Sequence, residues 1–142
     1  MSATNKAIIQ AFLDDVVNLG RLERANDLVK EDFIELDPLP GQQQGREGLK
    51  AVIAMLRSAF HDMHWTVQEM VAEGEKVVTR FSWTGTHRGP FLGIPATGRS
   101  VEVKGVVIDR LEDDKMADSR LLMDTMSLMQ QLGVIPPPAP PA

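Results

Sequence analysis

The sequence predicts an α+β domain in which three N-terminal helices pack on a curved antiparallel sheet and enclose an apolar pocket. In the first 60 residues, apolar side chains recur with helical spacing. Four runs rich in β-branched and aromatic residues follow, and short acidic turns join two pairs of them. Helices that come first, with antiparallel strands after them, are typical of folds that keep their helices on one face of a sheet.

The helical part begins with a stripe that predicts a helix over residues 5–19, with Gly20 expected to end it. That stripe consists of Ile9, Phe12, Leu13, Val16 and Val17. A second, short helix is expected over 22–30 and an extended segment over 33–38. A further apolar stripe predicts the third helix over 47–60.

Strands are expected over residues 65–72, 76–87, 99–111 and 116–124, with hairpin turns at 73–75 and 112–114 and a closing helix over 125–132. Because strand residues alternate between faces, Val107 and Asp109 share the face turned toward the helices. Gly85 and Gly105 lie in mid-strand, where glycine lets the sheet bend at little cost in free energy. Asp124 is expected to cap the closing helix.

Composition restricts the function classes. We expect one domain over residues 1–135 and a flexible Pro/Ala-rich tail over 136–142. The 15 Lys and Arg against 20 Asp and Glu are scattered, so nucleic acid is not expected as a partner. The chain has no cysteine, which fits a reducing compartment. No apolar run approaches the roughly 18 residues that span a bilayer, so the sequence predicts a cytoplasmic protein without a membrane partner.

Three glycine-containing segments resemble a known family. They are Gly-Thr-His-Arg-Gly at 85–89, Gly-Ile-Pro-Ala-Thr-Gly at 93–98 and Gln-Leu-Gly at 131–133. With this spacing the chain resembles, over about residues 5–135, the SnoaL-like polyketide (ester) cyclases of the nuclear-transport-factor-2-like superfamily. The resemblance implies a cone-shaped fold, a buried ligand pocket and cofactor-free chemistry. In the best-known members an aspartate, helped by Gln and His side chains, moves the proton in an intramolecular aldol ring closure of a polyketide ester.

The residues at those family positions differ in this chain. Counted back from the Gln-Leu-Gly segment at 131–133, the aspartate position falls on Leu121 and a histidine position falls on Ser119. The Gln and His positions of the preceding strand fall on Gly105 and Val107. Because a leucine cannot transfer a proton, the family mechanism does not carry over residue for residue.

Glu35 is the first candidate for a general acid or base, because it most nearly matches a polar family position in the 33–35 segment and burial would raise its pKa. The alternative is a glutamate turned outward. Asp109 is the second candidate, or else a solvated charge near a hairpin. The residues expected to bind substrate are Trp83, His87, Gly105, Val107, Ser119, Leu121 and Met123. His87 is also expected to fix the loop over the pocket mouth.

Three hypotheses for function follow. The first is a cofactor-free cyclase or isomerase acting on a small apolar carbonyl compound, and the second is a non-catalytic or weakly catalytic module that binds a small apolar molecule. The third is epoxide-hydrolase-like water activation by Asp109, Arg120 and Asp118 or Asp124, which strand alternation disfavours. No metal site is expected. A homodimer is expected, because the outer face of the sheet mixes charge with β-branched residues.

Overall fold

The computed structural model describes residues 2–136, so the tail beyond Pro136 lies outside the described part of the chain. The helical segments are α1 (Ser2–Ala11), the π-helix η1 (Phe12–Asn18), the 3₁₀-helix η2 (Leu22–Arg24), α2 (Ala25–Leu28), α3 (Gly45–Ala59) and α4 (Thr125–Gln131). The strands are β1 (Val29–Glu35), β2 (His64–Glu73), β3 (Lys76–Thr86), β4 (Ser100–Glu112) and β5 (Lys115–Met123). These bounds confirm the predicted order of elements.

The five strands form one sheet in the order β1-β5-β4-β3-β2. Strands β2 to β5 pair antiparallel, as predicted, whereas β1 pairs with β5 in parallel, so the sheet is mixed. The predicted second helix, over 22–30, is longer than the observed one, because the chain from Val29 onward belongs to β1. The backbone is already extended at Val29, which is fully buried and pairs with Met116.

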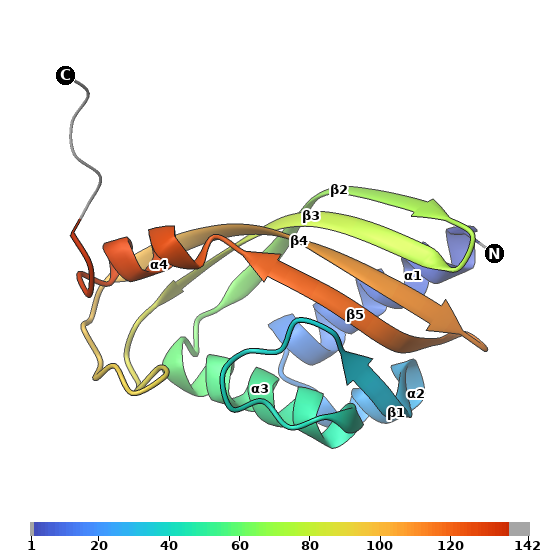
Figure 1. The fold of residues 1–142 in the computed structure, drawn as a ribbon, viewed down its shortest axis with the longest axis horizontal. Coiled ribbons are helices and arrows are strands. Elements are labelled where there is room, and N and C mark those ends of the chain that lie inside the picture. The colour runs from blue at the N-terminus through green and yellow to red at the C-terminus, as the bar shows by residue number, and fades with distance from the viewer. Residues whose placement is uncertain (1, 137–142) are drawn as a thin grey trace.

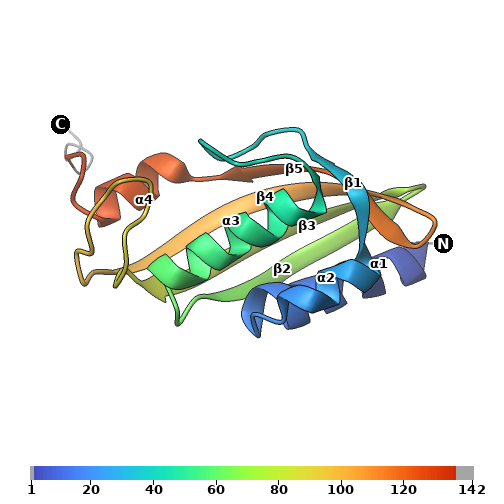
Figure 2. The same cartoon turned by 90° about the horizontal axis from the view of Figure 1, so that it is seen from below.

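The helices α1 and α3 lie across one face of the sheet, and no described element covers the other face (Figures 1 and 2). The predicted first helix is present, but its second half is a π-helix, in which the Leu19 N–H donates to the carbonyl of Asp14 at 3.2 Å. Gly20 ends it with a φ of 72°, as predicted. Arg57 of α3 donates to the carbonyls of Val17 and Asn18, both at 2.8 Å, and so supplies partners that the helix end lacks.

The two glycines predicted to bend the sheet sit where aromatic rings approach the backbone. A Cβ at Gly85 would lie 3.0 Å from Cβ of Phe60, and one at Gly105 would lie 2.5 Å from the ring of Phe81. Phe81 pairs directly with Gly105 across β3 and β4. The missing side chains therefore let these rings pack close to the strands.

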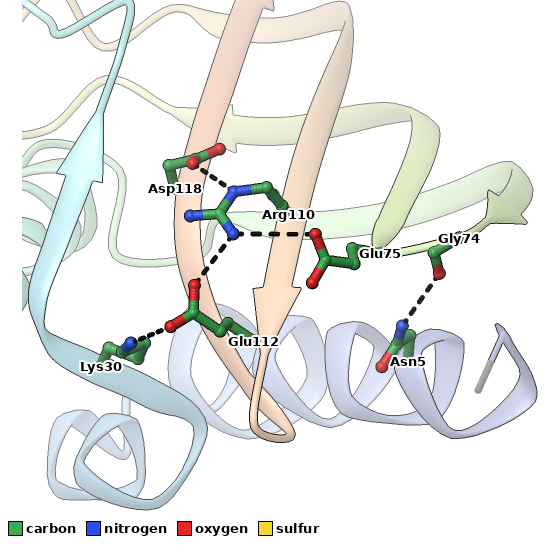
Figure 3. Close-up of polar contacts among 7 residues, drawn as sticks. All are labelled: Asn5, Lys30, Gly74, Glu75, Arg110, Glu112 and Asp118. Atoms are coloured by element: carbon green, nitrogen blue, oxygen red, sulfur yellow. Dashed lines mark hydrogen bonds and ion pairs between the residues drawn. The ribbon is translucent and has the colours of Figure 1, made fainter.

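A group of charged residues ties the strands together at the end of the sheet that carries both hairpin turns (Figure 3). Arg110 pairs with Asp118 at 2.7 Å, with Glu112 at 3.1 Å and with Glu75 at 3.9 Å. Lys30 of β1 also reaches Glu112, at 2.8 Å. This cluster connects β1, β4, β5 and the turn after β2.

Helix α4 continues the chain beyond β5. The carboxylate of Asp124 accepts from the N–H of Ser127 at 3.0 Å, which confirms the predicted cap. The side-chain amide of Gln131 donates to the carbonyl of Glu102 and accepts from its N–H, both at 2.8 Å, and so occupies the edge of β4 as a paired strand would. None of the described helices is long and apolar enough to cross a membrane.

Candidate active site

A strip of buried polar side chains crosses three adjacent strands. Glu35 of β1 pairs with Ser119 of β5, and Ser119 in turn pairs with Asp109 of β4. Their exposed fractions are 6%, 4% and 2%, respectively. Because residues in register across neighbouring strands point to the same face, the two carboxyl groups lie on one wall with the serine hydroxyl between them.

This strip lines a cavity of about 70 Å³ between the sheet and the helices. The rest of the lining is almost entirely apolar and comes from η1, α3, the strands β1, β2, β4 and β5, and the segment before β2. It comprises Phe12, Leu13, Val17, Phe33, Leu49, Val52, Ile53, Leu56, Met63, Trp65, Val107, Met116 and Leu121, with Gln42 as a further polar side chain. A few polar groups on one wall of an apolar cavity can orient a small molecule through its polar end.

Burial raises the pKa of Glu35 to about 7, and hydrogen bonds from backbone N–H groups partly oppose that rise. The N–H of Asp37 donates to the Glu35 carboxyl group at 3.1 Å, and the backbone of Leu121 and Leu36 also lowers its pKa. The side chain of Gln44 holds the Glu35 backbone, because it accepts from the N–H at 3.2 Å and donates to the carbonyl at 3.3 Å. These contacts therefore hold Glu35 in place as part of the cavity lining.

Burial also raises the pKa of Asp109 to about 7. A hydrogen bond from Ser119 opposes this rise, while the negative charges of Glu35 and Asp118 add to it. The Oδ1 atom of Asp109 is buried and has no hydrogen-bond partner among the described residues. Neither Asp109 nor Glu35 takes part in an ion pair within residues 2–136.

The other acids considered in the sequence are engaged elsewhere. Asp37 lies 3.7 Å from Arg120, whose side chain is half-exposed, and Asp118 pairs with Arg110. Asp124 caps α4. Asp109 lies on the buried face of β4, so it does not meet Arg120 in a water-activating cluster.

Of the residues expected to bind substrate, Val107, Ser119 and Leu121 line the cavity together with Glu35 and Asp109. Trp83, His87, Gly105 and Met123 are not part of its lining. The indole N–H of Trp83 instead donates to the sulfur of Met123 at 3.3 Å. The ring of Phe81 packs against Gly105, where an added Cβ would lie 2.5 Å from it.

His87 is fully buried and holds the loop that follows β3. Its Nδ1 accepts from the N–H of Thr97 at 3.2 Å, and its ring stacks on Phe60 with 5.3 Å between centroids. The N–H groups of Arg88 and Gly89 donate to the carbonyl of Ala59 at the end of α3. These contacts explain the glycine at position 89, where a Cβ would lie 2.5 Å from the carbonyl oxygen of Ser58.

Sequence reasoning did not identify Gln42 or the η1 wall of the cavity. Gln42 lies in the loop between β1 and α3 and donates its own backbone N–H to the carbonyl of Leu39 at 3.0 Å. Phe12, Leu13 and Val17 carried a helical signal, which predicts burial but does not say against what. No local pattern distinguishes a core position from a cavity wall.

Fold and site together define a class of small α+β proteins with an open sheet, helices on one face and a cavity between them. The chain belongs to the SnoaL-like polyketide cyclase family, whose model matches residues 7–132. The resemblance inferred from the glycine segments is thereby confirmed.

Two curated relatives are aklanonic acid methyl ester cyclases. DnrD of Streptomyces peucetius is 31% identical over 84% of this chain and 79% of its own length. DauD of Streptomyces sp. strain C5 is 26% identical over 84% of this chain and 76% of its own. Among solved structures, TsrD of Streptomyces laurentii is 32% identical, covers 94% of this chain and 97% of its own, and superposes with a TM-score of 0.85. The two curated cyclases support a cyclase-like role.

Proposed function

We propose that this protein catalyses a cofactor-free, polyketide-cyclase-like reaction on a small apolar carbonyl compound, either an aldol ring closure or an isomerisation. Glu35 is the proton carrier in this proposal, and Asp109 is the second carboxyl group of the same site. The observation that carries the proposal is the placement of both buried carboxyl groups on the wall of an apolar cavity. The family membership supports the reaction class.

The chemistry requires a base that accepts a proton from carbon and returns it to the alkoxide oxygen in an aldol ring closure, or to another carbon in an isomerisation. Such a group works best when its pKa lies near the working pH. Burial brings the pKa of Glu35 to about 7, so both of its protonation states are accessible near neutrality. Glu35 therefore supplies, from a different strand, the proton-transfer capacity that Leu121 lacks at the family position.

The cavity is smaller than the roughly 300–1,000 Å³ that is usual for ligand sites. Its volume of about 70 Å³ therefore requires the lining to move when a substrate of ordinary ligand size enters. The segment from residue 36 to 44 carries Gln42 of the lining, and Gly41 and Gly45 within or beside it have φ values of 81° and 84°. We expect this segment to shift outward when substrate binds.

The test is a turnover assay with the purified chain and aklanonic acid methyl ester, the compound named for two relatives. An aldol ring closure conserves all atoms, so product is separated from substrate by chromatography rather than by mass. We expect ring closure without any added cofactor, at a rate that dialysis against a chelator leaves unchanged. Saturable binding without product would instead favour the binding-module hypothesis, and a rate lost on chelation would contradict the cofactor-free reaction.

We also propose that two copies associate through the outer face of the sheet. Val106 and Leu122 are neighbours there, with exposed fractions of 37% and 65%. The same face carries both signs of charge, on Arg80, Lys104, Glu69 and Glu102. A two-fold interface brings a surface against itself, which requires such self-complementary charge.

We expect Leu122→Glu to convert the dimer to a monomer, because two added carboxylates would face each other in the apolar part of the interface. Light scattering coupled to size-exclusion chromatography measures the mass directly. Leu19→Glu is the matched control, since Leu19 is 58% exposed but lies at the end of η1, on the helix-covered side of the sheet. A monomeric wild-type protein, or a Leu122→Glu dimer, would contradict the proposal.

A further inference from the structure

We propose that the two carboxyl groups have separate roles: Asp109 stays protonated and donates a hydrogen bond to the substrate carbonyl oxygen, while Glu35 alone takes and returns the proton. This inference rests on the proposed function and deepens it. It makes Asp109 a catalytic acid that stabilises charge without giving up its proton. It also makes Ser119 a positioning residue that acts through Asp109.

The first observation is the unequal supply of hydrogen-bond donors. The Glu35 carboxyl group accepts a hydrogen bond from the N–H of Asp37 at 3.1 Å, which favours its ionised form, and the backbone of Leu121 and Leu36 acts on its pKa in the same direction. For Asp109 the Ser119 hydroxyl is the one group that lowers the pKa, and Oδ1 has no partner among the described residues. Ionising Glu35 therefore costs less free energy than ionising Asp109.

The second observation is that one carboxyl oxygen of Asp109 is buried without a hydrogen-bond partner within residues 2–136. Its residue is 2% exposed, and Oδ1 has no partner among the described residues. Its strand neighbours on the buried face are Val107 and Leu111, and Val77 lies opposite on β3. An ionised carboxylate with an unpaired oxygen in such surroundings is costly, whereas a neutral acid can direct its O–H into the cavity.

The third observation concerns the order in which the protons leave. The negative charge of Glu35 raises the pKa of Asp109, and no other titratable side chain lines the cavity. Once Glu35 is ionised, a second charge on the same wall is opposed by repulsion. Repulsion therefore favours a single negative charge on this wall near neutrality, and the donor at Glu35 together with the unpartnered Oδ1 of Asp109 favours that charge on Glu35.

This arrangement gives a balanced sequence of steps for an aldol ring closure. The Glu35 carboxylate takes a proton from the carbon next to the substrate carbonyl, and the electron pair becomes an enolate whose oxygen accepts from the Asp109 O–H. The enolate carbon then bonds to the second carbonyl carbon, whose C=O π bond becomes an alkoxide. Protonated Glu35 returns its proton to that alkoxide. Asp109 begins and ends the cycle protonated.

The order of ionisation can be tested without substrate, by carboxyl ¹³C NMR titration of the wild-type chain, Glu35→Gln and Asp109→Asn. The group that titrates second feels the charge of the one that titrates first. We therefore expect Glu35→Gln to lower the pKa of Asp109, and Asp109→Asn to leave the pKa of Glu35 nearly unchanged. The opposite asymmetry would overturn the assignment, whether or not the protein turns over any substrate.

The role of the Asp109 proton is tested by comparing Asp109→Asn with Asp109→Leu in the turnover assay. Asparagine keeps an N–H donor, so we expect turnover lowered by less than about tenfold, with the alkaline limb of the pH profile lost. Leucine keeps no donor, and loss of one such donor typically lowers kcat by about 10²–10³-fold. In the wild type the Ser119 hydroxyl opposes the rise in the pKa of Asp109. Ser119→Ala removes this effect and should therefore move the alkaline limb of the pH profile to higher pH.

Equal loss of turnover in Asp109→Asn and Asp109→Leu, with folding intact, would overturn the donor role of Asp109 while the proton-carrier role of Glu35 still held. Full activity of Glu35→Gln would instead refute the proposed site itself. Thermal unfolding of each variant, followed by circular dichroism, separates either result from a failure to fold. The two proposals can therefore fail independently.

Discussion

Glu35→Gln is expected to lower turnover by about 10²–10⁴-fold, the usual contribution of a positioned general acid or base. Glutamine fills the same space and keeps an oxygen that accepts from the N–H of Asp37, but it cannot take a proton. The loss should therefore appear in kcat, with the fold retained. The measurement is steady-state kinetics at pH 7 on wild-type and variant protein.

Glu31→Gln is the matched control for this change. Glu31 lies on the same strand β1, but its side chain is exposed and lies outside the cavity lining. The chemical change is identical, so we expect turnover within a factor of two or so of the wild type. Equal effects of the two substitutions would exclude Glu35 as the proton carrier.

The free energy of unfolding is expected to fall as the pH rises from 5 to 8. Glu35 and Asp109 each have a folded-state pKa raised to about 7, from ordinary values of 4.5 and 3.8. Between those limits the folded chain binds more protons than the unfolded chain, so stability decreases with pH until both groups are ionised. One pKa unit corresponds to about 1.4 kcal/mol, so each group contributes on the order of 3 kcal/mol over the window.

Other carboxylates do not obscure this window. Hydrogen bonds from Thr86 lower the pKa of Asp62, and hydrogen bonds from Lys30 and Arg110 lower that of Glu112. Groups with lowered pKa stabilise the fold above their unfolded pKa and lose this effect only at more acidic pH. Their contribution is therefore constant between pH 5 and 8.

Urea unfolding at several pH values measures the effect, with the Glu35→Gln, Asp109→Asn double variant as the control. That variant carries amides in place of both acids and should unfold with a free energy that is nearly independent of pH over the same window. At pH 8 it should also be more stable than the wild type. A wild-type stability that stays level or rises from pH 5 to 8 would show that neither carboxyl group is buried in its neutral form.

Much of this structure could be predicted from local patterns. Helical and strand periods depend on side chains a few residues apart, so the expected ranges of α3, β3 and β5 differ from the observed ones by only a residue or two. Alternation along β4 also placed Val107 and Asp109 on the buried face. A period cannot reveal which buried positions touch a cavity, and Trp83 and Met123 accordingly lie buried or partly buried outside it.

The site itself depends on a pairing that no local pattern contains. By itself the sequence determined the family, the order of elements and the buried face of each long strand, because these follow from short-range periodicity and from recognisable turns. Only the tertiary structure decided that β1 pairs in parallel with β5, since the chain must cross over before those strands can meet. That pairing puts Glu35 beside Ser119 and Asp109, and so turns two separate acids into one wall of the cavity.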